Sequence, residues 1–186
     1  TIDDAVGESF DKVAKILGLH YPGGPKIEQH AKKGKINYFK LPHPMENKKN
    51  LNFSFSGIKT AVNLIVKNSK KIDTNFKNNM CASFQNKISN ILDKRVKLAF
   101  EYLKKKNIKV DCVSVVGGVA INKFIRSNLS KICKNNKCSL VFPPKEMFGD
   151  NAAMIAWACI NKYNINQKPN LFFKANPRLT VNENDL

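Results

Sequence analysis

Apolar residues near the start of the chain recur at the spacing of a helix. Wound at about 100° per residue, the segment divides into an apolar and an acidic side. The apolar positions are Val6, Phe10, Val13 and Leu17. The acidic positions, almost opposite, are Asp4, Glu8 and Asp11. The pattern therefore predicts an amphipathic helix with an acidic face.

The ends of this first helix also carry signals. Asp3 or Asp4 can cap its N-terminus, because a short carboxylate accepts hydrogen bonds from free backbone N–H groups. Gly18 suits the left-handed position after a helix. The segment "YPGGP", residues 21–25, then reads as a sharply turned loop.

The acidic face has two interpretations. It can be an ordinary solvated face, or its carboxylates can accept hydrogen bonds from the hydroxyl groups of a sugar. Gly7 in mid-helix and the Gly23-Gly24 pair favour the second, because bare backbone lets a flat ring or ribose approach. Both interpretations stay open on these residues alone.

Two further helices are predicted before residue 106. Residues 77–105 carry apolar side chains every three to five positions, which indicates a long helix packed on the core. A shorter helix is expected over about 58–66, after the alternating segment "FSFSG". At that junction Ser56, Gly57 and Lys59 form either a hydrophobic plug with a turn or an anion site at a helix N-terminus.

Strands are predicted in the second half of the chain. The β-branched run from Val110 to Val116 is typical of a buried strand, and Gly117-Gly118 forms the turn before a helix over about 122–132. A strand, a glycine pair and a helix can bind a nucleotide, although a plain turn between strand and helix has the same pattern. A second strand is expected over 139–142.

The segment "FGDNAAMIAWACI" predicts an Ala-rich buried helix with Asp150 at its N-cap. Asp150 can instead bind a metal, which would require further ligands. His20, His30 and His43 are not spaced as ligand pairs, so this chain by itself offers no convincing metal site. Cys133 and Cys138 have no second pair nearby, which argues against zinc there.

Composition changes the picture only in part. The chain has 186 residues, 42% of them hydrophobic, with no apolar run long enough for a membrane span, so we expect a soluble intracellular protein with reduced cysteines. Its formal net charge is +18. Only Arg95, Arg126 and Arg178 among the 32 basic residues are arginine. This lysine excess reflects either an RNA partner or a proteome rich in Lys and Asn.

Four motifs together resemble one family. In chain order they are "DDAVGESFDKVAKILGLHYPGGP", "FSFSGIKTAV", "GGVAINKFIR" and "GDNAAMIA". They resemble the C-terminal half of the TsaD family of tRNA threonylcarbamoyladenosine transferases, formerly called O-sialoglycoprotein endopeptidases. The likeness extends from Thr1 to about Arg178.

The resemblance implies an α/β fold of the actin-like ATPase, sugar-kinase type. The family has two lobes around a nucleotide cleft, and residues 1–186 would form the C-terminal part, with a mostly helical insertion over roughly 26–105 and the N-terminal lobe missing. We therefore expect a fragment of a longer chain. Two metal-binding histidines and a serine-glycine phosphate loop of the family precede this region, so the fragment alone is expected to be inactive.

The resemblance also implies a reaction. The family transfers a threonylcarbamoyl group from threonylcarbamoyl-adenylate to the adenosine next to the anticodon of tRNAs that read codons beginning with A. Implied cofactors are an adenylate or ATP-type nucleotide and one divalent metal, iron or zinc. Implied partners are tRNA and the TsaB-type and TsaE-type proteins, in the cytoplasm.

Site residues follow from the same resemblance. Asp11, Gly24 and Asn122 are expected to contact the adenylate, with Gly117 and Gly118 forming the adenosine turn. Glu8, on the acidic face, is a further nucleotide-binding candidate, and Asp150 matches the family's metal-binding carboxylate. Two residues depart from the family's pattern: Gly149 replaces a small hydroxyl or thiol residue and would loosen the metal loop, and Ile121 replaces the usual Ala and adds bulk behind the adenosine turn.

Two rival functions share this cleft architecture. The chain could be a nucleotide-binding ATPase module without acyl transfer, or a non-catalytic truncated lobe that packs on a partner. The upstream sequence would discriminate, because an H-x-x-x-H pair and a serine-glycine-glycine loop favour the transferase. A peptidase activity is the weakest alternative, since no protease motif is present.

Overall fold

The long helix predicted over residues 77–105 is the element on which the other helices pack. In a computed structural model, which describes residues 1–165, this helix is α4 and runs from Thr74 to Lys105. The side chain of Asp73 caps it by accepting a hydrogen bond from the backbone N–H of Phe76 at 2.8 Å.

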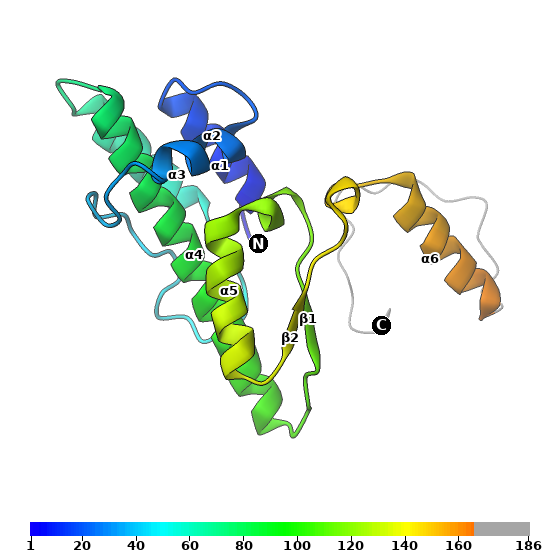
Figure 1. The fold of residues 1–186 in the computed structure, drawn as a ribbon. Helices are drawn as coiled ribbons and strands as arrows, with labels where there is room; N and C mark the ends of the chain where they lie inside the picture. The colour runs from blue at the N-terminus through cyan, green and yellow to red at the C-terminus, as the bar shows by residue number, and fades with distance from the viewer. Residues whose placement is uncertain (166–186) are drawn as a thin grey trace. The chain divides into compact units, whose positions relative to one another are not determined.

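The described residues form two units, Thr1–Gly149 and one that starts at Asp150, and each is considered by itself. The first unit mixes helices with a small two-stranded parallel sheet (Figure 1). Its other elements are α1 (Val6–Ile16), α2 (Gly23–Ala31), α3 (Ser56–Lys67), β1 (Cys112–Ser114), the 3₁₀ turn η1 (Gly118–Ile121), α5 (Lys123–Asn135), β2 (Ser139–Val141) and the 3₁₀ turn η2 (Lys145–Met147). The second unit contributes α6 (Ala152–Asn164).

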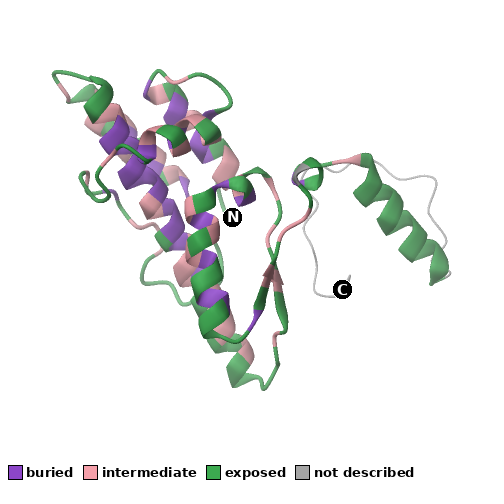
Figure 2. Cartoon of the chain, viewed as in Figure 1, coloured by how far each residue is buried: buried purple, intermediate pink, exposed green. Residues whose placement is uncertain are grey.

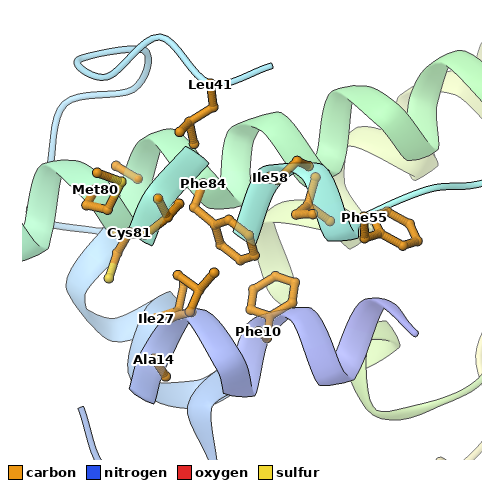
Figure 3. Close-up of a cluster of buried hydrophobic side chains, with 14 of the residues drawn as sticks. Phe10, Ala14, Ile27, Leu41, Phe55, Ile58, Met80, Cys81 and Phe84 are labelled. Carbon is orange, nitrogen blue, oxygen red and sulfur yellow. The ribbon is translucent and has the colours of Figure 1, made fainter. Parts of the chain in front are cut away.

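The core lies between α1, α2, α3 and the first two thirds of α4, and α5 adds Ile125 and Leu129 to it. Figure 2 shows the buried residues gathered there, and Figure 3 shows Phe10 of α1 facing Phe84 of α4. The two rings meet edge to face with their centroids 5.0 Å apart. Burying each ring contributes roughly 1.5–3 kcal/mol, and their contact adds about 1 kcal/mol. The helical periodicity read from the sequence therefore identified the correct core face.

A polar side of α4 is buried as well, which the sequence did not indicate. Asn79 and Ser83 accept hydrogen bonds from the backbone N–H groups of Lys35 and Phe39, at 2.8 and 3.0 Å. These bonds attach the segment after α2 to α4. Gly34 is required there, because a Cβ on it would lie 2.0 Å from the backbone oxygen of Asn78.

Arg95 is buried within the fold, with 3% of its surface exposed. Its guanidinium donates hydrogen bonds to the backbone oxygens of Met45, Lys48 and Asn50, at 2.7, 2.7 and 2.6 Å. One side chain on α4 thus satisfies three carbonyls of the segment that precedes "FSFSG", and Arg95 is not available for a ligand.

The ends of α1 confirm one prediction and correct another. Gly18 has φ +64, and the N–H groups of Gly18 and Leu19 return to the carbonyls of Lys15 and Ala14, so the left-handed helix end is confirmed. The N-cap is Ala5, and no side chain caps this helix, so the prediction for Asp3 or Asp4 was wrong.

The predicted loop at "YPGGP" was also wrong in part, because α2 already begins at Gly23. The N-cap of α2 is Pro22, and the proline at position 25 is tolerated since the first helical turn has no internal partner for its N–H group.

Two parallel strands are present, but the prediction that Val110–Val116 is a buried strand was wrong. The strand β1 covers only Cys112–Ser114, and it pairs with β2 in the register Cys112↔Ser139. Cys112 and Ser114 are exposed, and Val116 is 69% exposed. Within residues 1–149, β1 pairs only with β2, and α5 packs on β2, so the sheet lacks the two covering layers that parallel sheets usually have.

The prediction of a buried helix after Asp150 was wrong for the described residues, because no residue of α6 is buried. The described part of this unit offers no surface for α6 to pack on. The N-cap is Asn151, whose side chain accepts from the N–H of Met154 at 3.0 Å, so the cap predicted for Asp150 belongs to its neighbour. Among the described helices, none combines the length and the hydropathy that a membrane span requires.

Candidate functional site

The turn between β1 and α5 is held by backbone hydrogen bonds. Gly117 has φ +88 and ψ 163, a conformation that residues with a Cβ rarely adopt. Its N–H donates to the carbonyl of Phe148 at 3.0 Å, and its carbonyl accepts from Ala120 at 2.9 Å. The chain then makes the short turn η1 and enters α5, as the strand, glycine pair and helix pattern predicts.

A pocket of about 80 Å³ opens beside this turn. Three of the predicted nucleotide-binding residues, Gly24, Gly118 and Asn122, line it together although they are distant in the sequence. The remaining lining residues are Phe10, Pro25, Glu28, Val119 and Ile121. Mostly apolar walls with a few polar groups suit one flat ring better than a whole nucleotide, since complete ligand pockets are usually several times larger.

Three glycines around this region have different roles. A Cβ added to Gly24 or to Gly118 would meet no atom within 4 Å, so the backbone at both positions is open to an approaching group. A Cβ on Gly23 would lie 2.7 Å from the Cβ of Ala14. Gly23 therefore serves the close packing of α1 on α2 and is not a place for a ligand.

Asn122 closes the pocket and also caps α5. Its side-chain oxygen accepts from the N–H of Ile125 at 3.1 Å, and its amide nitrogen donates to the side chain of Gln85 at 2.8 Å. The residue is 7% exposed. The NH₂ group has two hydrogens and the bond to Gln85 uses one, so the group has the capacity for a second hydrogen bond.

Glu28 is a lining residue that the sequence analysis missed. Its Oε1 accepts a hydrogen bond from the backbone N–H of Lys123, the first residue of α5, at 2.9 Å. A carboxylate there also interacts favourably with the positive end of the helix dipole. Glu28 lies four residues after Gly24, one helical turn on, and that spacing was the available signal.

The acidic face of α1 is not brought into this pocket. Asp11 accepts a hydrogen bond from the N–H of Gly23 at 2.8 Å and so supports the start of α2. Glu8 forms an ion pair with Lys12 at 2.7 Å, and Asp4 lies 2.9 Å from the same lysine. The bonds to Glu8 and Asp4 raise the pKa of Lys12, and the bond from Lys12 lowers the pKa of Asp4. Ligand contacts by Asp11 and Glu8 stay predictions.

The start of α3 is already occupied by a carboxylate of the same chain. Asp3 accepts hydrogen bonds from the hydroxyls of Ser54 and Ser56, at 2.5 and 3.0 Å, and from the N–H of Phe55 at 2.8 Å. Burial raises the pKa of Asp3, but these bonds outweigh it and lower that pKa to about 2. The anion site considered for Ser56 and Lys59 is therefore filled internally, which favours the structural interpretation.

Asp150 is exposed and lies at the start of the second unit. Throughout residues 1–165, no three His, Cys, Asp or Glu side chains come together as ligands of one ion. One carboxylate does not fit a metal site by itself, since protein sites for iron or zinc use three or four ligands. The metal-binding role of Asp150 stays a prediction.

Comparison with known proteins gives a consistent result. The sequence profile of the family "TsaD: tRNA N6-adenosine threonylcarbamoyltransferase" matches residues 1–157. A protein of that name from Pelagibacter ubique is 49% identical over 180 residues, which cover 96% of this chain and 50% of the relative. Those from Rickettsia rickettsii and Wolbachia pipientis wMel are 45% identical, covering 88% and 96% of this chain and 48% and 52% of theirs. The chain thus spans about half the length of these relatives.

Proposed function

We propose, because the chain belongs to the TsaD family of tRNA N6-adenosine threonylcarbamoyltransferases, that the protein acts in threonylcarbamoylation of tRNA. The expected product is the modified adenosine next to the anticodon of tRNAs that read codons beginning with A. The observation that carries the proposal within the structure is the pocket that unites Gly24, Gly118 and Asn122. These are three of the positions that the resemblance assigns to the adenylate.

The proposed fold is the C-terminal part of an actin-like ATPase fold. Residues 1–186 would belong to it, with a helical insertion over roughly 26–105. The short parallel sheet of β1 and β2, followed by a glycine turn and α5, is the feature that supports it. The exposed sheet is consistent with further strands outside the described residues, because parallel sheets are normally covered on both faces.

The proposed role of the pocket is to position the adenylate of the donor. In the transfer, the adenosine amine attacks the carbamoyl carbon of threonylcarbamoyl-adenylate, a new N–C bond forms, the bond to the adenylate oxygen breaks and the amine loses a proton. Bare backbone at Gly24 and Gly118 would let the adenine lie close, and the amide N–H of Asn122 would donate to it. Fixing the leaving group in this way contributes through orientation.

A metal cofactor, two partner proteins and a location are also proposed. Asp150 would supply one ligand to a divalent metal, iron or zinc, and no step above depends on it. TsaB-type and TsaE-type proteins are the proposed partners, and the cytoplasm is the proposed location.

The test compares two glycine variants of the protein in its full natural form. Gly118→Val adds bulk where the pocket opens, and Gly57→Val adds the same bulk at another helix start with room for a Cβ, the nearest atom being 3.6 Å away. We expect Gly118→Val to weaken AMP binding, measured by calorimetry, about tenfold or more, with the melting temperature and the Gly57→Val variant little changed.

Modified adenosine in tRNA, quantified by mass spectrometry, should fall with AMP binding. Normal AMP affinity in a folded Gly118→Val protein would contradict the pocket assignment. Tight AMP binding with no tRNA modification, even with both partner proteins added, would favour a nucleotide-binding ATPase module.

A further inference from the structure

A second and larger hollow lies at the opposite end of α5 from the pocket. It has a volume of about 680 Å³ and is formed by the C-terminal end of α4, the segment that leads to β1 and the turn after α5. We call it the basic groove. Its lining residues are Lys97, Phe100, Glu101, Leu103, Lys104, Asn107, Ile108, Lys109, Val110, Asn136 and Lys137.

The lysines of the basic groove outnumber its acids. Lys97, Lys104, Lys109 and Lys137 line it and are exposed, whereas Glu101 is the one acidic lining residue. Lys109 is partly neutralised, because its ammonium lies 2.8 Å from the carboxylate of Asp111. The lining therefore keeps an excess of positive charge at the exposed Lys97, Lys104 and Lys137, although Asp93 interacts electrostatically with Lys97, and this excess favours an anion.

The basic groove also has an apolar floor. Phe100 is half-buried, and Ile108 is 51% exposed. A channel that combines lysines with an accessible aromatic ring is the arrangement by which proteins hold single-stranded nucleic acid, since the lysines follow the phosphates and a base stacks on the ring. These apolar side chains would not contribute to the binding of a simple inorganic anion.

Charge is distributed unevenly along the sequence of this unit. Residues 94–137 contain twelve Lys or Arg and two Asp or Glu, whereas residues 1–31 contain three and five. Two of the three arginines are used by the fold. Arg95 is buried, and Arg126 donates to the backbone oxygen of Ala120 and stacks on Phe142 at 4.1 Å. The positive surface near the groove is therefore made of lysine.

Lysines at the end of a helix also compensate its dipole, and this explains part of the groove. Lys104 lies in the last turn of α4 and interacts favourably with the free carbonyls there. Lys97 lies two turns earlier, and Lys137 follows the end of α5 in a left-handed conformation, with φ +54. The dipole therefore does not account for the convergence of these side chains on one hollow.

We propose that the basic groove binds the sugar-phosphate backbone of a single-stranded segment of tRNA, which rests on the proposed function for the identity of the RNA. The helix α5 connects the two sites, with Asn122 of the pocket at its start and Asn136 of the groove just after its end. Its 13 residues span about 20 Å. One tRNA molecule can reach both ends, so the groove holds the substrate while its adenosine is presented elsewhere.

The test changes the charge of the groove without touching the pocket. Lys97→Gln, Lys104→Gln and Lys137→Asn are combined in the full natural protein, with asparagine at 137 because it tolerates the left-handed conformation. The control combines Lys40→Gln, Lys49→Gln and Lys70→Gln, three exposed lysines outside the groove. Both variants lose the same charge, so compositional charge alone predicts equal effects.

Binding of unmodified tRNA and of an oligouridylate is measured by fluorescence anisotropy over a range of salt concentrations. For the groove variant we expect affinity at about 0.1 M salt to fall at least tenfold, and the slope of log K against log salt to decrease by about 2–3. AMP binding should not change. The control variant should keep its slope within about 1 of the unmodified protein.

Equal losses in both variants, or no loss in the groove variant, would overturn the proposal. If the groove variant loses affinity for oligouridylate while the unmodified protein fails to modify tRNA, the groove stands as an RNA site and the proposed function fails. If tRNA modification is normal in the groove variant across the salt range, the groove is not where the substrate is held.

Discussion

The two glycine pairs of this protein, Gly23-Gly24 and Gly117-Gly118, look alike in the sequence, and within each pair the two members have different roles. In each pair the first glycine is required by the fold, Gly23 because α1 leaves no room for a Cβ and Gly117 because its φ is +88. The second glycine of each pair, Gly24 or Gly118, has no atom within 4 Å of an added Cβ and lines the pocket. A glycine pair can thus combine one structural and one binding position.

The largest effect is expected for Gly23→Ala. The new Cβ would lie 2.7 Å from the Cβ of Ala14 and 2.8 Å from the Cα of Asp11, so α1 and α2 must move apart. Overpacking of this kind costs about 2–3 kcal/mol of the free energy of unfolding. The check is thermal denaturation followed by circular dichroism. A melting temperature equal to that of the unmodified protein would show that the two helices adjust freely.

A smaller effect is expected for Gly117→Ala. No atom lies within 4 Å of the added Cβ, so the cost comes only from the backbone conformation and amounts to about 1–3 kcal/mol. Chemical denaturation measures it, with Gly118→Ala as the matched control because Gly118 does not have a positive φ. Equal stability of the two variants would remove the distinction between the glycines of this pair.

A third prediction concerns the carboxylate that supports the first pair. Asp11→Ala removes the acceptor for the N–H of Gly23 and should cost about 1 kcal/mol of stability. Asp11→Asn keeps an acceptor oxygen and should cost less. If AMP affinity falls in both variants by more than the stability loss explains, Asp11 also contacts the nucleotide. Unchanged AMP affinity in both would leave it only its structural role.

The smallest effect on stability is expected for Gly24→Ala. Position 24 is helical and open, and alanine is favoured over glycine in helices by up to about 1 kcal/mol, so stability should be unchanged or slightly higher. AMP binding should nevertheless weaken, because Gly24 lines the pocket. If the variant is less stable than the unmodified protein, Gly24 is required by the fold, as Gly23 is.

How far the sequence predicted these features depends on the range of the interactions involved. The helices α1, α3, α4 and α5 and the glycine turn were predicted, because apolar spacing and glycine act within a few residues. The difference between Gly23 and Gly24 was not, since it depends on where Ala14 lies in three dimensions. The same is true of Asp3, whose partners are more than fifty residues away.

Burial was the least predictable property. The polar residues of α4, such as Asn79 and Ser83, look solvent-exposed in a periodic pattern, yet they are buried because backbone N–H groups of a distant segment need acceptors. Val116 looks buried because it ends a β-branched run, yet it is exposed where the sheet is uncovered. A pattern reports the polarity of a side chain, and the partner that it meets is decided by the tertiary fold.

The buried Arg95 shows where the strong preference of this protein for lysine ends. Lysine fills all but three of the 32 basic positions, so composition alone predicts that an exchange of Arg for Lys is harmless. At residue 95 it would not be, because a planar guanidinium reaches three backbone oxygens in fixed directions, whereas an ammonium is a compact point charge on a flexible stem. At residue 95 the choice between the two cations is thus decided by the shape of the side chain and not by its charge.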